Sequence, residues 1–194
     1  FGLGAEAPLI LLVFFVAGFA AMPLWTAYSK RSEKHIALRI VCLWSAVTFP
    51  LYLIFSLNGG GATLMLIGAV ITGLGYGTPF ILARSMMADI IERAEMQTGT
   101  VRPGLYYSLM SAAYKTGASL AIGIPYIILG ALIGFDASGN NPPDVVTGLM
   151  LVFVGVPMIC YLIAAALTVG YTLTRTEQAS NAATLKANKA RVAE

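Results

Sequence analysis

A single lysine interrupts the apolar stretch GLYYSLMSAAYKTGASLAIGIPYIILG at residues 104–130. Lys115 is the only formally charged residue in this stretch, and Ser108 and Ser111 precede it at the i, i+3, i+7 spacing that shares one face of a helix. Tyr114 overlaps that face. Hydroxyls, an aromatic ring and a cation can bind a polyol through hydrogen bonds and through stacking on its C–H faces. The pattern therefore predicts a cavity lined for a polar ligand or an ion.

No other pattern in the sequence indicates chemistry. Cys42 and Cys160 lie in apolar runs without metal-ligand spacing, and the lone His35 lies in a basic loop. The glycines of GLGYG at 73–77 lie in an apolar run, which favours close helix packing over phosphate binding. There is no HExxH or GxSxG pattern and no basic run interleaved with aromatics. We expect no enzyme activity, metal, organic cofactor or nucleic-acid partner.

Composition predicts that these residues lie in a lipid bilayer. Hydrophobic residues make up 58% of the 194 and charged residues 11%, whereas soluble domains carry roughly 25% charged residues. Five continuous apolar runs each reach the length of about 20 residues that a transmembrane helix needs, without the alternation of barrel strands. We predict an all-α integral membrane protein whose transmembrane bundle covers 1–173, with spans near 8–29, 37–57, 62–86, 104–134 and 145–173. Pro23, Pro50, Pro79, Pro125 and Pro157 lie within spans and are expected to kink them.

The basic residues alternate from loop to loop. Eleven of the 12 Lys and Arg lie in 30–39, in 84–102 or in the tail 174–194, whereas the loops 58–61 and 135–144 have none. Basic loops face the cytoplasm. We therefore expect the N-terminus outside and the C-terminus inside a plasma (inner) membrane, with the polar tail as a cytoplasmic helix or a disordered segment.

Lys115 is the basic residue that remains, and it lies deep in the bilayer. It follows the start of its span by about ten residues, or roughly 15 Å, in a hydrocarbon core about 30 Å thick. An isolated charge at that depth costs at least about 2.5–3.5 kcal/mol. No Asp or Glu in the five spans lies at a matching depth. The partner is then water, a substrate or a carboxylate on helices outside this chain; the alternative is a neutral lysine whose pKa burial has lowered.

A longer run around this lysine resembles a known transporter family. Residues 88–135, ADIIERAEMQTGTVRPGLYYSLMSAAYKTGASLAIGIPYIILGALIGF, are similar to the tenth-to-eleventh helix region of the glycoside–pentoside–hexuronide:cation symporters. These are the melibiose-permease-like members of the major facilitator superfamily. PLWTAYSKRSEKH at 23–35 resembles the family's loop after the eighth helix, and YTLTRTEQ at 171–178 the end of its twelfth. The matching positions in the first run are Asp89-Ile90-Ile91, Glu95, Thr98-Gly99, Gly104, Lys115 and Gly134-Phe135.

The resemblance implies that the five spans are helices 8–12 of a twelve-helix major facilitator fold. The chain begins with Phe1 and would be the C-terminal portion of a cation-coupled symporter that moves a sugar or glycoside with sodium or a proton. The family's cation-binding carboxylates lie mostly on the N-terminal half, which is missing here and would supply the partner of Lys115. Ser111, Tyr114 and Phe80 would line the sugar side of this coupling site.

Three positions depart from the family pattern. Phe80 stands where melibiose permease has a tryptophan. The phenylalanine ring can still stack on a sugar, but it lacks the indole N–H donor. Residues 101–104, Val-Arg-Pro-Gly, lack a second basic residue that is usual there, and Glu33 replaces an expected glycine. These differences leave the substrate open.

The charged segment 84–104 has two interpretations. In such transporters charged residues at cytoplasmic helix ends close a gate between the two halves, and Arg84, Asp89 and Arg102 would contribute to it. Asp89 and Arg93 are spaced i, i+4 and could form an ion pair. The alternative is an ordinary solvated interfacial stretch, in which surface ion pairs contribute little.

Two other functions fit the same spans. One is a major facilitator transporter of an organic anion or a lipid-like solute, for which a lateral opening lined by apolar residues is expected. The other is a non-transporting membrane subunit that is complete with five helices.

Overall fold

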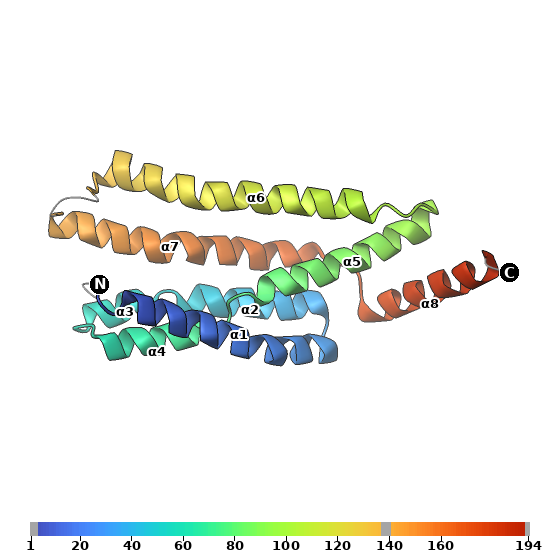
Figure 1. Ribbon diagram of the computed structural model, residues 1–194, viewed down its shortest axis with the longest axis horizontal. Coiled ribbons are helices and arrows are strands. Elements are labelled where there is room, and N and C mark those ends of the chain that lie inside the picture. Colours follow the sequence, from blue (N-terminus) through green and yellow to red (C-terminus); the bar gives the residue numbers. More distant parts are fainter. Residues whose placement is uncertain (1–3, 137–140, 193–194) are drawn as a thin grey trace.

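The computed structural model describes residues 4–136 and 141–192 (Figure 1). In this part of the chain five helical segments are long and apolar enough to cross a membrane. They are Ala7–Arg31, Lys34–Leu57, Ala62–Thr98, Pro103–Ile133 and Pro143–Gly170. The predicted all-α membrane protein with five transmembrane helices is thus confirmed.

Proline lies at or beside the breaks within the spans, and it has no backbone N–H to donate to a helix. Pro50 separates α2 (Lys34–Thr48) from α3 (Leu51–Leu57), and Pro79 lies in the first turn of α5 (Thr78–Thr98), just after α4 (Ala62–Gly73). Pro125 lies in the last turn of α6 (Pro103–Ile127), which continues as the π-helical segment η1 (Ile128–Ile133). Pro23 and Pro157 lie inside α1 (Ala7–Arg31) and α7 (Pro143–Leu167), which are continuous helices.

The glycines of GLGYG form the break between α4 and α5 and allow α1 to approach it. A Cβ on Gly73 would clash with the carbonyl oxygen of Phe14 on α1, and one on Gly77 would meet the Met22 side chain. Gly77 also has a φ of 76°, in the left-handed region that favours glycine. This close approach supports helix packing as the role of the motif.

The helices pack around α2. Figure 1 shows α1 and α4 on one side of α2 and α7 on the other, while α6 runs along the outside of α7. One buried cluster comprises Ala37, Val41 and Leu82, and a second comprises Tyr52, Met65 and Val154. The second cluster joins α3, α4 and α7, which belong to the second, third and fifth spans.

Polar contacts fix the ends of these helices. The Trp25 indole Nε1 donates to the Leu74 carbonyl at 2.7 Å, which ties α1 to the break after α4. The Arg39 guanidinium donates to the hydroxyl and the carbonyl of Thr168 at 3.0 and 3.1 Å. That contact holds α2 to η2 (Thr168–Gly170), from which the chain leads into α8 (Arg175–Val192), a helix that projects beyond the bundle in Figure 1.

Candidate functional site

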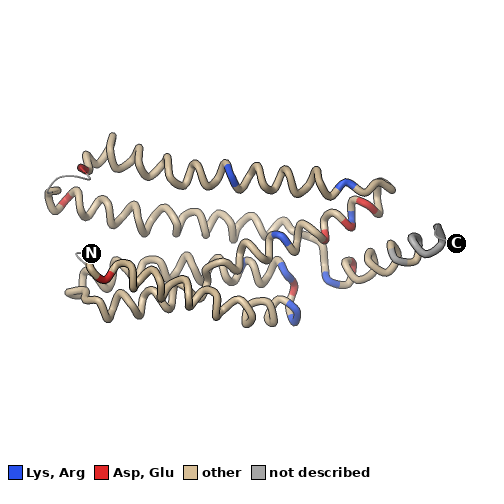
Figure 2. Tube along the Cα trace, in the orientation of Figure 1, with Lys and Arg blue, Asp and Glu red and all other residues tan. Residues whose placement is uncertain are grey.

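Lys115 lies in the middle of α6, as its position in the apolar run predicts. Apart from one position on α6, the Lys and Arg residues gather toward one end of the helices in Figure 2. Lys115 is the only Lys or Arg between Pro103 and Ile133. It follows the first residue of α6 by twelve positions, or about 18 Å of helix. Its side chain is exposed and has no hydrogen bond or ion pair within 4–136 and 141–192. The lysine therefore has no anionic partner in the described part of this chain.

The rest of its polar face is equally open. No residue of α6 is buried, and Ser111 is exposed without a hydrogen-bonding partner among the residues described. The Ser108 hydroxyl donates to the Leu105 carbonyl of its own helix at 2.8 Å, and the Ser119 hydroxyl donates to the Lys115 carbonyl at 3.0 Å. The face is available to a partner from outside the described residues.

Two of the predicted substrate-lining residues meet where α5 contacts α6. The rings of Phe80 and Tyr114 lie 5.5 Å apart between centroids, at an interplanar angle of 55°. The Arg84 guanidinium carbon lies 4.3 Å from the Phe80 ring centroid, within the range of a cation–π interaction. This stack links α5 to α6. Tyr114, its residue on α6, immediately precedes Lys115 in the sequence. It also engages Arg84 with an aromatic ring.

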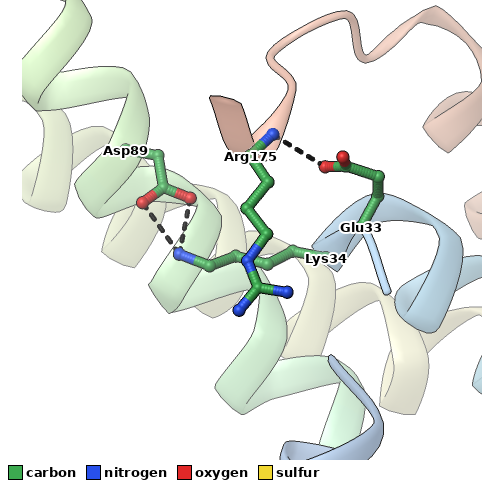
Figure 3. Close-up of polar contacts among 4 residues, drawn as sticks. All are labelled: Glu33, Lys34, Asp89 and Arg175. Carbon is green, nitrogen blue, oxygen red and sulfur yellow. Dashed lines mark hydrogen bonds and ion pairs between the residues drawn. The ribbon is translucent and has the colours of Figure 1, made fainter. Parts of the chain in front are cut away.

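Asp89 forms an ion pair with Lys34 at the end of the bundle that carries the basic loops (Figure 3). Lys34 Nζ donates to both carboxylate oxygens of Asp89, at 2.8 and 2.7 Å, and only 9% of Asp89 is exposed. The pair joins the start of α2 to the middle of α5. The described residues form no ion pair between Asp89 and Arg93; the Asp89 carboxylate binds Lys34 on α2 instead.

The three residues predicted for a cytoplasmic gate therefore lie apart. Arg84 stacks on Phe80 and Asp89 binds Lys34. Arg102 caps α6 and is exposed, with no ion pair to the other two in the described residues. No contact among the described residues brings the three side chains together.

The start of α8 attaches to the same end of the bundle. The Glu33 carboxylate accepts a hydrogen bond from the Arg175 backbone N–H at 2.9 Å. The Thr174 N–H donates to the Glu177 carboxylate at 3.0 Å and the Glu177 N–H donates to the Thr174 hydroxyl at 3.3 Å, a reciprocal capping box. The hydrogen bond from the Thr174 backbone N–H lowers the pKa of the Glu177 carboxyl below its ordinary value. Burial, and then the nearby Asp89, raise the pKa of Tyr171 to about 12, so its phenol is neutral at pH 7.

Lys34 and Arg175 were not among the site residues predicted from the sequence, and Glu33 was noted there only as a departure from the family pattern. The available signal was weak: Lys34 and Asp89 both lie on the basic side, at the ends of consecutive spans. Pairing them needs the tertiary contact between α2 and α5, which hydropathy does not provide. Within the part of the chain that the structure describes, no three His, Cys, Asp or Glu residues are grouped as metal ligands.

Comparison with known proteins relates the chain to transporters. A family described as MFS/sugar transport protein matches residues 2–175. The sodium-dependent lysophosphatidylcholine symporter 1-A of Danio rerio is 27% identical over 122 residues, which are 62% of this chain and 22% of that protein. The uncharacterized symporter sll1374 of Synechocystis is 24% identical over 99 residues, 50% of this chain and 18% of that protein. The chain thus spans about a fifth of the length of the curated relatives it matches.

Proposed function

Because the chain belongs to the MFS/sugar transport protein family, we propose that the full-length protein is a secondary active transporter that moves a sugar or glycoside together with sodium or a proton. The five spans correspond to helices 8–12 of a twelve-helix fold, related to the glycoside–pentoside–hexuronide:cation symporters. The N-terminus of the chain lies outside and its C-terminus in the cytoplasm. Two six-helix bundles rock around a site near the midplane.

One observation carries this proposal: Lys115 is a cation in the middle of an apolar span, without a partner among the described residues. Ionisable residues inside the membrane face a cavity or a partner and mark ion and substrate paths. A carboxylate from the other half of the protein meets Lys115 in the coupling site. Ser111, Tyr114 and Phe80 line the substrate side, which the Phe80–Tyr114 contact at 5.5 Å supports.

The charged end of the bundle serves as the cytoplasmic gate. The Lys34–Asp89 pair keeps α2 and α5 together as one rigid unit. Arg102, which is exposed, is free to pair with the opposite half when the gate closes. Arg84 contributes by holding Phe80 through its cation–π contact. In this proposal Arg102 acts between the two halves of the protein, whereas Asp89 acts within the half that this chain forms.

A lipid-like substrate is the second candidate. It is favoured by the name of the Danio rerio relative, a lysophosphatidylcholine symporter. It is also favoured by a cavity of about 450 Å³ on α6 and η1, lined by apolar side chains that include Ile122, Tyr126 and Leu129. Such a lining suits an acyl chain better than a sugar. A transporter of this kind would use the same Lys115 beside an anionic or zwitterionic headgroup.

A direct uptake experiment separates the two candidates. The full-length protein in proteoliposomes is given sugars, glycosides, organic anions and lysophosphatidylcholine, each with a sodium gradient, a proton gradient or none. We expect a sugar or glycoside to accumulate above its equilibrium concentration only when one of the gradients is present. Gradient-driven uptake of lysophosphatidylcholine alone would favour the lipid-like substrate. Uptake that is the same with and without gradients would contradict cation coupling.

A further inference from the structure

A polar cavity lies at the charged end of the bundle, away from Lys115. Its volume is about 260 Å³, and α1, α2, α5 and α8 all contribute to its lining. That volume is well above the about 10–15 Å³ that holds one water, and slightly below the about 300–1,000 Å³ of sites for drug-sized ligands. The cavity therefore suits a small polar group.

The charges that line the cavity are mainly positive. Lys30, Lys34 and Arg175 contribute three cations, against one carboxylate from Glu33. Lys34 is already bound by Asp89, and Glu33 accepts the Arg175 backbone N–H. In Figure 3 the Arg175 side chain extends from this contact toward Lys34. The cavity thus has an excess of positive charge after its internal contacts are made.

Several donors in the lining are not used by the described residues. The Lys30 ammonium, the Arg175 guanidinium and the Ser85 hydroxyl have no hydrogen-bonding partner within 4–136 and 141–192. A guanidinium binds two oxygens of a phosphate in a planar fork, and a lysine adds a point charge. Donors from three helices therefore converge on a space that fits a tetrahedral anion.

The surroundings of the cavity are apolar and exposed. Ile81 is part of the lining and is 36% exposed, and Leu24 on α1 is 71% exposed. Both side chains lie on helical segments long and apolar enough to cross a membrane. A phosphate in the cavity can therefore belong to a lipid whose acyl chains lie along α1 and α5, and basic pockets between helices on the cytoplasmic side bind such headgroups.

From this arrangement we propose that the cavity is a binding site for a phosphate group, supplied by an anionic lipid of the cytoplasmic leaflet or by a soluble phosphate. Lys30, Arg175 and Ser85 contact the phosphate oxygens. The site is separate from the substrate path and touches the Lys34–Asp89 pair through Lys34. Binding there places a negative charge next to the ion pair that joins α2 to α5.

The test measures binding to the purified full-length protein in uncharged detergent at physiological salt. The probes are short-chain phosphatidylglycerol, phosphatidylcholine with the same chains, and inorganic phosphate. We expect phosphatidylglycerol to bind more tightly than phosphatidylcholine. Lys30→Gln and Arg175→Gln should each weaken that binding about fivefold, since one cationic residue near an anionic headgroup contributes about 1 kcal/mol.

Arg31→Gln is the matched control, because it removes the same charge from the neighbouring residue, which does not line the cavity. It should leave the affinity unchanged. If phosphatidylglycerol does not bind but inorganic phosphate does, and if Lys30→Gln and Arg175→Gln weaken phosphate binding, the site takes a soluble phosphate. Equal affinity for the two lipids without phosphate binding, or equal losses for Arg31→Gln and Lys30→Gln, would overturn the proposal. Lys30 has no other described contact, so that variant remains informative even if Arg175→Gln fails to fold.

Discussion

Replacing Lys115 with alanine is expected to abolish cation-coupled uptake by the full-length protein. In the proposed coupling site, the substitution leaves a carboxylate of the other half without a counter-charge at the centre of the membrane. We expect the coupled rate to fall about 100-fold or more, which corresponds to about 2.7 kcal/mol or more of activation free energy. The measurement is the initial rate of gradient-driven uptake in proteoliposomes, normalised to the amount of protein incorporated.

The amount of folded Lys115→Ala protein should stay at the wild-type level, because the side chain makes no contact in the described residues that the substitution could remove. Ser119→Ala is the matched control one turn away; its hydroxyl bonds only the backbone of its own helix. It should transport at the wild-type rate. Coupled uptake by Lys115→Ala at the rate of Ser119→Ala would exclude Lys115 from the coupling site.

The second large effect is expected for Asp89→Asn. This change leaves the Lys34 ammonium, whose side chain is only 27% exposed, without its carboxylate. If the pair were fully buried, the loss in the free energy of unfolding would be about 3–5 kcal/mol. Because Lys34 is partly exposed, we expect a loss of about 2 kcal/mol. Thermal unfolding of the full-length protein in detergent should show a lower Tm, and hydrogen exchange should rise at the start of α2 and the middle of α5.

Glu92→Gln is the control for this variant, since Glu92 lies on the same helix and forms no ion pair among the described residues. It should leave the Tm unchanged. Lys34→Met should lower the Tm as well, and the double variant should be more stable than the sum of the single losses predicts, because the two residues interact directly. Additive losses in this cycle would show that the pair does not stabilise the contact between α2 and α5.

The spans could be predicted from the sequence because lipid imposes one strong rule: every backbone donor and acceptor must be satisfied within a helix. Apolar runs then identify helices without knowledge of their neighbours. The break at Pro50 followed from the missing N–H of proline, and the break before Pro79 is formed by the glycines of 73–77, whereas Pro23 and Pro157 are accommodated in α1 and α7. The presence of proline in an apolar run therefore does not by itself predict whether the helix is interrupted.

Features of the site that depend on a single helix could be predicted from the sequence. Contacts between two helices could not. The unpartnered position of Lys115 follows from hydropathy and a count of charges. The partner of Asp89 does not: local spacing favours Arg93, whereas the packing of α5 on α2 brings Lys34 to 2.7 Å. In the same way, the cavity between Lys30 and Arg175 joins residues that are far apart in the sequence.

The most direct test of the central claim is whether the face of α6 that carries Lys115 lines a water-filled path. In a cysteine-free version of the full-length protein, Ser111→Cys and Leu109→Cys place thiols at similar depth, about 200° apart around the helix. We predict that a water-soluble, membrane-impermeant thiol reagent modifies the cysteine at 111 quickly and the one at 109 very slowly, and that coupling cation with substrate slows the reaction at 111. Equal reactivity at the two positions would contradict the assignment of this face to the transport path.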